Sequence, residues 1–379
     1  MSTDIQPFRI DVPDAVLDDL RDRLRRTRFP AAAPEGSWDY GTERGWLEEL
    51  VTYWADKFDW RSHEERLNCW DHFTTTLRGE HIHFLHVRSP HPDAVPLIIS
   101  HGWPGSVAEF VDIIDPLVDP VSHGGEERDA FHLVIPSLPG FGWSGPTTGR
   151  GIGPWVTAEM WAELMARLGY ELYGAQGGDW GALITTNLGR LDADHVLGIH
   201  LNMPTARPDP ETMEDLQEDE KEALAAAKYY RDEDSGYFKQ QSTRPQTVGY
   251  ALEDSPAGLA AWIGEKFRTW TDCDGDVYRA VEREALLRNI TIYWVTATAH
   301  SSARMYYEHV HHPGEESYVA VPTGVARFPR EIFRPSRRWA EKAYDIRHWT
   351  EYTRGGHFAA MEVPDLLVQD IRAFFRLVR

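Results

Sequence analysis

The chain of 379 residues is poor in cysteine, in basic charge and in long apolar runs. Cys69 and Cys273 are too few for a disulfide framework and indicate a reduced, cytoplasmic protein. The formal net charge of −21 argues against nucleic acid or an anionic membrane as a partner. No run approaches the roughly 18 apolar residues of a membrane span. Residues 1–5 lack the apolar region of a signal peptide, so we expect no membrane attachment and no secretory leader.

Cofactor and metal motifs are missing as well. No Gly-x-Gly-x-x-Gly opens a helix, so no dinucleotide site is indicated. The segment around Ser144 is not Gly-x-Ser-x-Gly and does not support a serine nucleophile. His81 and His83 share one face of a strand, and the histidines at 309–312 are typical of a solvated helix end. Neither group has further ligands at metal-site spacing, so we expect no metal and no cofactor.

Apolar periodicity predicts strands that alternate with helices. Amphipathic helices are expected at 11–28 and 46–60, and a β-hairpin with a glycine turn at 73–87. Further strands are expected at 95–100, 131–136, 171–174, 196–203, 318–321 and 346–352, and helices at 158–168, 180–191 and 364–377. Alternation of this kind favours an α/β fold whose mostly parallel sheet is covered by helices on both faces.

One stretch departs from this alternation. Residues 205–300 are helix-rich, acidic and rich in tryptophan and tyrosine, with no strand of similar quality. We therefore predict an N-terminal region at 1–92 that packs on the core, and a core made of residues 93–204 and 316–379. A helical cap at 205–315 is inserted between the two parts of the core.

The most informative segment is Gln176-Gly-Gly-Asp-Trp-Gly181. It joins a predicted strand to a predicted helix, which is the arrangement of the nucleophile elbow in the α/β-hydrolase fold. Gly177 and Gly181 suit the close packing of such a turn. The central residue is Asp179 where a serine would give an esterase. Attack by a carboxylate on carbon forms an alkyl ester, so the substrate must be an epoxide or an alkyl halide.

A carboxylate nucleophile needs a base that activates water and an acid that orients the base, in the chain order nucleophile, acid, histidine. His357 lies in a glycine loop between the last predicted strand and the last helix. Glu331 follows the strand expected at 318–321. Both positions fit the order, although Asp345 and Glu351 are alternative carboxylates nearby.

Two glycine-rich loops follow predicted strands and would border Asp179. In the loop His101–Ser106, the backbone N–H of Trp103 is placed to form an oxyanion hole with that of Trp180. The loop 139–145 carries Phe141 and would shape the site from another side. We expect Trp103, Trp180, Phe141 and Phe358 to contact substrate.

Together these motifs resemble epoxide hydrolases of the microsomal type. The resemblance rests on the segments 101–106, 139–145, 177–181 and 354–358, and on the N-terminal stretch with its helix at 11–28. It covers nearly the whole chain but not the hydrophobic membrane anchor of the mammalian enzymes. It implies an α/β-hydrolase fold with a helical cap, and a cis peptide between Trp103 and Pro104.

The resemblance also assigns roles to site residues. It implies that Asp179 is the nucleophile, Glu331 the acid and His357 the base. Two cap tyrosines, Tyr237 and Tyr306, would hold the epoxide oxygen and stabilise the alkoxide that forms when the ring opens. Tyr307 adjoins Tyr306, and because neighbouring helical residues point about 100° apart, only one of the two should face Asp179.

The expected function is hydrolysis of an epoxide to a vicinal diol, with epoxide and water as the only small-molecule partners. The aromatic cap hints at a bulky or aryl epoxide, in secondary metabolism or detoxification. A haloalkane dehalogenase with the same triad is the alternative, in which the Trp180 indole would hold halide. A non-catalytic ligand- or hormone-binding protein of the same fold is a third reading. A homodimer is the default expectation for such an enzyme.

Overall fold

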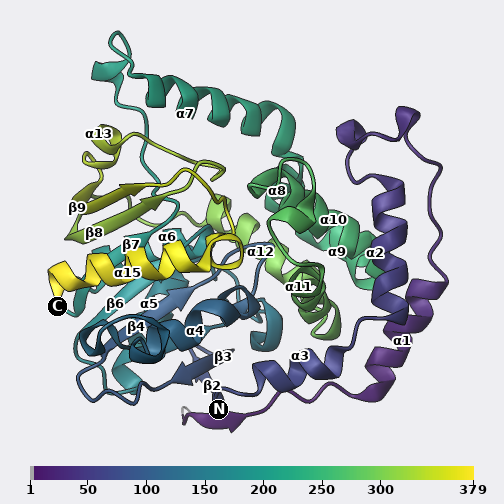
Figure 1. Ribbon diagram of the computed structural model, residues 1–379, viewed down its shortest axis with the longest axis horizontal. Coiled ribbons are helices and arrows are strands. Elements are labelled where there is room, and N and C mark those ends of the chain that lie inside the picture. Colours follow the sequence, from purple (N-terminus) through teal and green to yellow (C-terminus); the bar gives the residue numbers. More distant parts are fainter. Residues whose placement is uncertain (1–3) are drawn as a thin grey trace.

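The computed structural model describes residues 4–379, and its centre is one nine-stranded sheet (Figure 1). The strand order is β1-β2-β3-β5-β4-β6-β7-β8-β9; β1, β2, β3 and β5 pair antiparallel, and all neighbours from β5 to β9 pair parallel. The bounds are β1 Gln6–Phe8, β2 His72–Leu77, β3 Glu80–Val87, β4 Val95–Ser100, β5 Phe131–Pro136, β6 Tyr173–Gly177, β7 Val196–Leu201, β8 Val319–Arg327 and β9 Tyr344–Glu351. The predicted α/β fold class is therefore confirmed.

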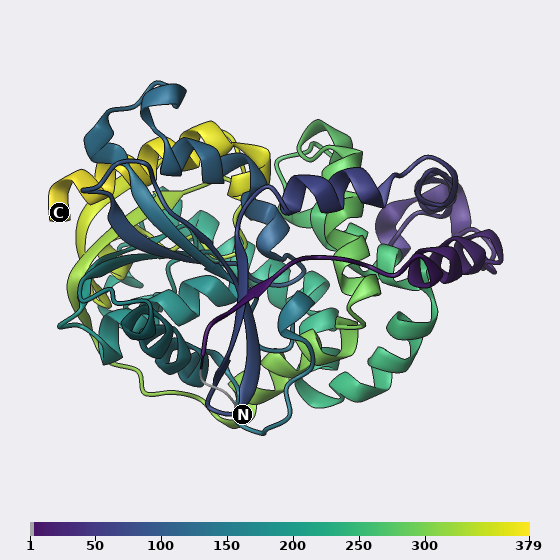
Figure 2. The same ribbon diagram turned by 90° about the horizontal axis from the view of Figure 1, so that it is seen from below.

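Helices cover both faces of this sheet. The helices α4 (Val111–Val118) and α15 (Pro364–Val378) pack together on one face, and α5 (Pro154–Arg167) and α6 (Trp180–Leu191) pack together on the other. Figure 2 shows the sheet between these two layers. The fit is close, since a Cβ atom on Gly174 of β6 would lie 2.2 Å from a phenyl carbon of α15. Burial on both faces explains why the inner strands β4 and β5 are mostly apolar, whereas the edge strand β9 carries several polar residues.

The region predicted to form the helical cap lies between β7 and β8 in the chain. Its helices are α7 Glu218–Tyr229, α8 Gly236–Thr243, α9 Pro245–Asp254, α10 Pro256–Trp270, α11 Arg283–Val295 and α12 Ala299–His311. Between α7 and α8 the chain forms a π-helical turn, η8 (Tyr230–Asp234). Helix α12, the last of these helices, packs against both α8 and α9.

The N-terminal region contacts both the core and the cap. Its strands β1 to β3 extend the sheet, whereas its helices α1 (Asp14–Arg25) and α2 (Arg44–Asp56) pack against α10. Helix α3 (Trp60–Leu67) packs against α11, and Figure 1 shows all three beside the cap. The N-terminal region therefore packs on the cap helices as well as on the core. Its boundary near residue 92 stays a prediction.

Several elements differ from the sequence-based expectation. The single helix expected at 46–60 is wrong, because α2 ends at Asp56 and the Asp59 carboxylate accepts a hydrogen bond from the N–H of Arg61 to begin α3. Strand β6 begins two residues later than expected and runs to Gly177. Strand β8 is much longer than 318–321 and brings the chain close to Glu331. Two short helices, α13 Arg337–Ala340 and α14 Ala359–Glu362, complete the fold. Within residues 4–379, no helix is long and apolar enough to cross a membrane.

Candidate active site

Asp179 occupies the predicted sharp turn between β6 and α6. Its backbone has φ 52° and ψ −127°, a conformation that costs a non-glycine residue of the order of 1–3 kcal/mol and that is concentrated at functional sites. The flanking glycines are sterically required. A Cβ atom at Gly177 would lie 2.2 Å from the carbonyl oxygen of Gly181, and one at Gly181 would lie 1.9 Å from that of Ser100. The turn therefore holds the Asp179 carboxylate at the end of the sheet.

The two oxygens of Asp179 face different groups. The backbone N–H of Trp103 donates to Oδ1 at 2.7 Å, and Nε2 of His357 lies 3.5 Å from Oδ2. Gly102 has no side chain, and a Cβ there would lie 2.2 Å from Oδ1. The Trp103–Pro104 peptide is cis, as expected. The Trp180 N–H begins α6 next to Asp179, and its part in an oxyanion hole stays a prediction.

His357 and Glu331 form a buried pair. Nδ1 of His357 donates to Oε1 of Glu331 at 2.6 Å, and both side chains are almost fully buried. Burial alone would lower the pKa of His357, but the Glu331 and Asp179 carboxylates outweigh it and raise that pKa well above 6.5. The alternative acids lie elsewhere: Asp345 pairs with Arg347, and Glu351 accepts from the indole of Trp349.

Two cap tyrosines and Trp180 gather beside Asp179. The Tyr306 ring lies 5.7 Å from the Tyr237 ring and 4.7 Å from Trp180. The Tyr306 hydroxyl and the Trp180 Nε1 are buried, and neither finds a partner within the described residues. Burial raises the pKa of both phenols well above 10, so both are proton donors at neutral pH. Tyr307 instead stacks on His311 at 3.9 Å, which leaves Tyr306 as the tyrosine that faces the site.

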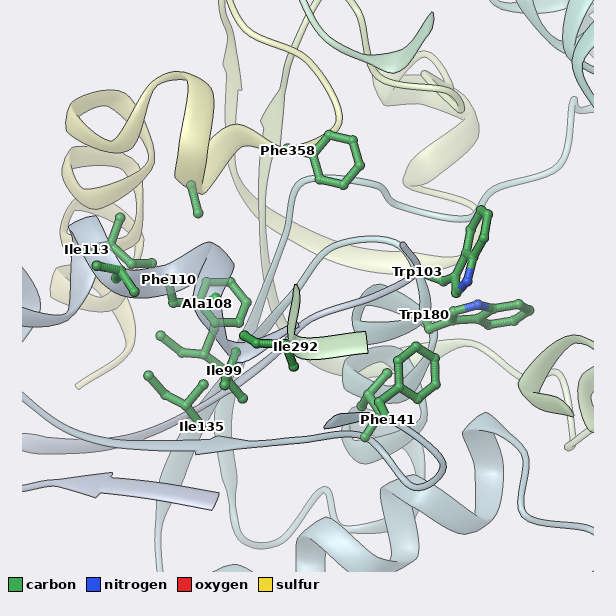
Figure 3. Close-up of a cluster of buried hydrophobic side chains, with 14 of the residues drawn as sticks. Ile99, Trp103, Ala108, Phe110, Ile113, Ile135, Phe141, Trp180, Ile292 and Phe358 are labelled. Atoms are coloured by element: carbon green, nitrogen blue, oxygen red, sulfur yellow. The ribbon is translucent and has the colours of Figure 1, made fainter. Parts of the chain in front are cut away.

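Aromatic side chains hold this arrangement in place. Trp103, Trp180, Phe141 and Phe358 belong to a cluster of buried hydrophobic side chains (Figure 3). Trp103 stacks on Tyr237 with a centroid distance of 5.0 Å and lies 5.8 Å from Tyr306. Phe358 stacks on Phe267 at 4.0 Å and borders His357. Phe141 packs on His101 and Tyr293, behind the site. Contact of these groups with substrate stays a prediction, and for Phe141 the packing suggests a supporting role.

A small cavity of about 20 Å³ reaches Asp179 and His357. Such a volume accommodates one water molecule. Its lining includes Glu109, a residue that the sequence analysis did not select. Burial raises the pKa of the Glu109 carboxyl to about 8, although the nearby His357 opposes the shift. The carboxyl needs the space at Gly105, where a Cβ would lie 1.2 Å from Oε1. A lone acid in the apolar run Val107–Phe110, directly after the predicted loop, was the available signal.

A larger, open hollow of about 580 Å³ lies outside the site, since Asp179, Trp180 and Tyr237 are not part of its lining. Its lining includes Trp155, Leu183, Phe333 and His309. His309 was expected to be solvated, and this is wrong. Its ring is half-buried 5.1 Å from that of Trp180, and burial lowers its pKa. The reason is that α12 continues past Tyr306 along Trp180 before it ends.

No group of three or more His, Cys, Asp or Glu side chains in residues 4–379 is arranged to hold a metal ion. His83 instead bonds to His72 at 2.8 Å and to the Ser137 hydroxyl at 2.9 Å. The polar groups that the structure brings together around Asp179 are the His357–Glu331 pair and the phenols of Tyr237 and Tyr306.

Comparison with known proteins identifies the family. Residues 5–110 match the family model described as the epoxide hydrolase N terminus, and residues 95–250 match that of the alpha/beta hydrolase fold. A protein of Stigmatella aurantiaca (strain DW4/3-1) with a provisional epoxide hydrolase name is 48% identical over 376 residues, which cover 99% of this chain and 86% of that one. Epoxide hydrolase 1 of Oryctolagus cuniculus is 39% identical over 405 residues, covering 99% of this chain and 89% of that one.

A solved structure supports the same assignment. Epoxide hydrolase from Aspergillus niger has a TM-score of 0.90 and 34% sequence identity, with 99% of this chain and 97% of that chain covered. These matches extend over the cap as well as the sheet, and the resemblance seen in the sequence motifs is confirmed. The chain belongs to the epoxide hydrolase family of enzymes with the α/β-hydrolase fold.

Proposed function

We propose that this enzyme converts a bulky or aryl epoxide to a vicinal diol through an ester of Asp179. The observation that carries the proposal is the placement of Asp179, next to the His357–Glu331 pair and opposite the buried phenols of Tyr237 and Tyr306. A carboxylate, a base and two neutral acids around one space match the needs of epoxide opening followed by ester hydrolysis.

In the first step Oδ2 of Asp179 attacks one epoxide carbon. The carbon–oxygen bond of the ring breaks, and its electron pair goes to the oxygen. Tyr237 and Tyr306 donate hydrogen bonds to that oxygen, and one of them transfers its proton. The choice of Oδ2 follows from the hydrogen bond that Oδ1 accepts from the Trp103 N–H.

In the second step His357 takes a proton from water, and the resulting hydroxide attacks the carbonyl carbon of the Asp179 ester. The negative charge develops on Oδ1, where the Trp103 N–H already donates, and the Trp180 N–H is the second proposed donor. Glu331 stabilises the imidazolium through Nδ1. Collapse of the intermediate restores Asp179 and releases the diol.

The size of the substrate is inferred from the aromatic side chains beside Asp179. The stacked rings of Trp103 and Tyr237, with the Tyr306 ring near both, would contact an apolar substituent of the epoxide. Bulky or aryl epoxides from secondary metabolism or detoxification would suit these rings. A cytoplasmic location and a homodimer complete the proposal.

The test is intact-protein mass spectrometry of His357→Gln after exposure to styrene oxide, with peptide mapping. We expect an adduct of the whole epoxide mass on Asp179, because the ester forms but is not hydrolysed. Asp179→Asn should give no adduct. Equal adduct formation in both variants would contradict the assignment of the nucleophile.

A haloalkane dehalogenase remains the competing function, because the unpartnered Nε1 of Trp180 would serve as a halide donor. The same His357→Gln variant should therefore also be exposed to phenethyl bromide. An alkyl adduct on Asp179 from the bromide, and none from the epoxide, would favour dehalogenation.

A further inference from the structure

A third tyrosine stands behind one of the two phenols that face Asp179. The hydroxyl oxygen of Tyr230 lies 2.8 Å from that of Tyr237. Tyr230 is the first residue of the π-helical turn η8, and its ring packs against Phe333. π-helical turns are rare and are frequent at functional sites, because the wider turn redirects side chains. Here the turn places the Tyr230 hydroxyl next to that of Tyr237.

The same turn places a buried cation on the ring of Tyr237. Nζ of Lys266 lies 4.8 Å from the centroid of the Tyr237 ring, and the lysine side chain is only 4% exposed. Asp234, the last residue of η8, holds this ammonium at 2.7 Å and also accepts from the indole of Trp270. The face of the Tyr237 ring therefore carries a cation–π contact in a desolvated setting.

Tyr306 has neither of these contacts. Its hydroxyl makes no hydrogen bond of regular geometry within residues 4–379, although the Trp180 indole and the Tyr237 hydroxyl are near enough to counter part of the rise in its pKa. The cation–π contacts there do not include its ring. The two phenols are thus unequal, although both border the same space opposite Asp179. A phenol buried as deeply as these resists the loss of its proton, because burial disfavours the phenolate. Tyr237 differs in having both a second phenol, whose hydroxyl can turn to donate to a phenolate, and an ammonium over its ring.

We propose that Tyr230 is a positioning residue that makes Tyr237, rather than Tyr306, the tyrosine that transfers its proton to the opening epoxide. The inference rests on the proposed function. As Asp179 attacks, the ring oxygen takes the electron pair of the broken bond and then the proton of Tyr237. The Tyr230 hydroxyl donates to the Tyr237 phenolate, and Lys266 attracts its charge. Tyr306 only donates a hydrogen bond and keeps its proton.

The proton count closes over the full cycle. Tyr237 gives one proton to the alkoxide, and His357 takes one proton from the hydrolytic water. Return of that proton to Tyr237, by way of the half-exposed Tyr230 and solvent, restores both groups. No external acid or base is consumed.

The test is a set of tyrosine-to-phenylalanine variants in single-turnover experiments with styrene oxide. Quenching of the fluorescence of Trp103 and Trp180 would report formation of the ester, and acid quench would report its hydrolysis. We expect Tyr230→Phe to slow ester formation about 10-fold, the size of one hydrogen bond to a developing charge, and to leave ester hydrolysis unchanged. Tyr229→Phe is the matched control, since that neighbouring ring is 60% exposed.

Double variants separate this role from a general effect on packing. In the Tyr237→Phe background, the added Tyr230→Phe change should alter ester formation less than 2-fold, because its partner is gone. In the Tyr306→Phe background the 10-fold effect should persist. A full effect in the absence of Tyr237, or loss of the effect in the absence of Tyr306, would overturn the proposal.

These outcomes are distinct from failure of the proposed function. If His357→Gln forms no ester with epoxides, the function itself is wrong. If the ester forms and Tyr230→Phe matches the wild-type rate, only the role of Tyr230 is wrong.

Discussion

The Glu109 carboxyl beside the nucleophile should make the stability of the fold depend on pH. In the folded protein it binds its proton up to about pH 8, whereas in the unfolded chain it releases the proton near 4.5. The stability that this group contributes is therefore complete below pH 4.5 and is lost as the pH rises to 8 and above. Glu109→Gln keeps the shape of the side chain and removes the titration.

The magnitude follows from the two pKa values. A difference between 4.5 and about 8 corresponds to at most about 5 kcal/mol of unfolding free energy. Glu109 lines a cavity large enough for a water molecule, which would hydrate the ionised carboxylate and reduce the cost of its burial. We therefore expect the unfolding free energy to change by about 2–5 kcal/mol. Relative to wild type, Glu109→Gln should gain this stability between pH 5 and pH 9.

The assay is urea denaturation followed by tryptophan fluorescence at pH 5, 6.5, 8 and 9. The quantity of interest is the unfolding free energy of Glu109→Gln minus that of wild type, plotted against pH. Glu65→Gln provides the control, because Glu65 is exposed, and its difference from wild type should stay flat. A flat difference for Glu109→Gln as well would mean that the carboxyl is ionised or solvated in the folded protein, and the reasoning would fail.

Three further changes test other parts of the structure by urea denaturation. Gly181→Ala should destabilise the fold by about 1–3 kcal/mol or more and abolish turnover, because its Cβ would meet the backbone oxygen of Ser100. Lys266→Met should cost about 3–5 kcal/mol, since it leaves the buried Asp234 unpaired, and adding Asp234→Asn should recover part of that loss. Burial lowers the pKa of His101 to about 4, so the folded state stays neutral while the unfolded chain takes up a proton below 6.5. Stability should therefore fall by up to about 3 kcal/mol from pH 6.5 to 4, and His101→Asn should show less of this fall.

The sequence alone was sufficient to bring together the site residues that directly follow strands of the parallel sheet. Asp179 follows a buried strand in a glycine-flanked turn, and His357 and Glu331 follow two later strands. In a parallel sheet the ends of such strands lie along one edge, so order alone brings these residues together. The 2.6 Å contact between His357 and Glu331 agrees with that reasoning.

The same reasoning could not find Tyr230 or Lys266. Tyr230 reaches Tyr237 because the chain makes a π-helical turn, and no simple periodicity predicts a turn of that width. Lys266 lies on α10, more than thirty residues from its partner Asp234. A lysine in an amphipathic helix is usually a solvated residue, and this one is enclosed by Asp234 and the rings of Tyr237 and Trp270.

The two cap tyrosines could be selected only through the resemblance to a known family, not from the sequence pattern itself. Resemblance to the family selected Tyr237 and Tyr306, since fifteen tyrosines in the chain offered no basis for choice. The packing of α12 on α8 then explains why these two meet. Tyr307, one position further on, points to His311 instead, as expected for the next residue of a helix.

The loop at 139–145 shows how the core positions a cap residue. The Ser301 hydroxyl of α12 donates to the carbonyl oxygen of Gly140 at 2.6 Å, and the N–H of Gly142 donates to the Thr298 hydroxyl at 3.2 Å. Gly140 has φ 90°, and a Cβ there would lie 2.9 Å from the backbone oxygen of Ser301. Its glycines thus let the start of α12 approach the loop, and five residues further along the same helix Tyr306 faces Asp179. The motif therefore acts on the chemistry through the helix that it holds, which explains why Phe141 packs behind the site.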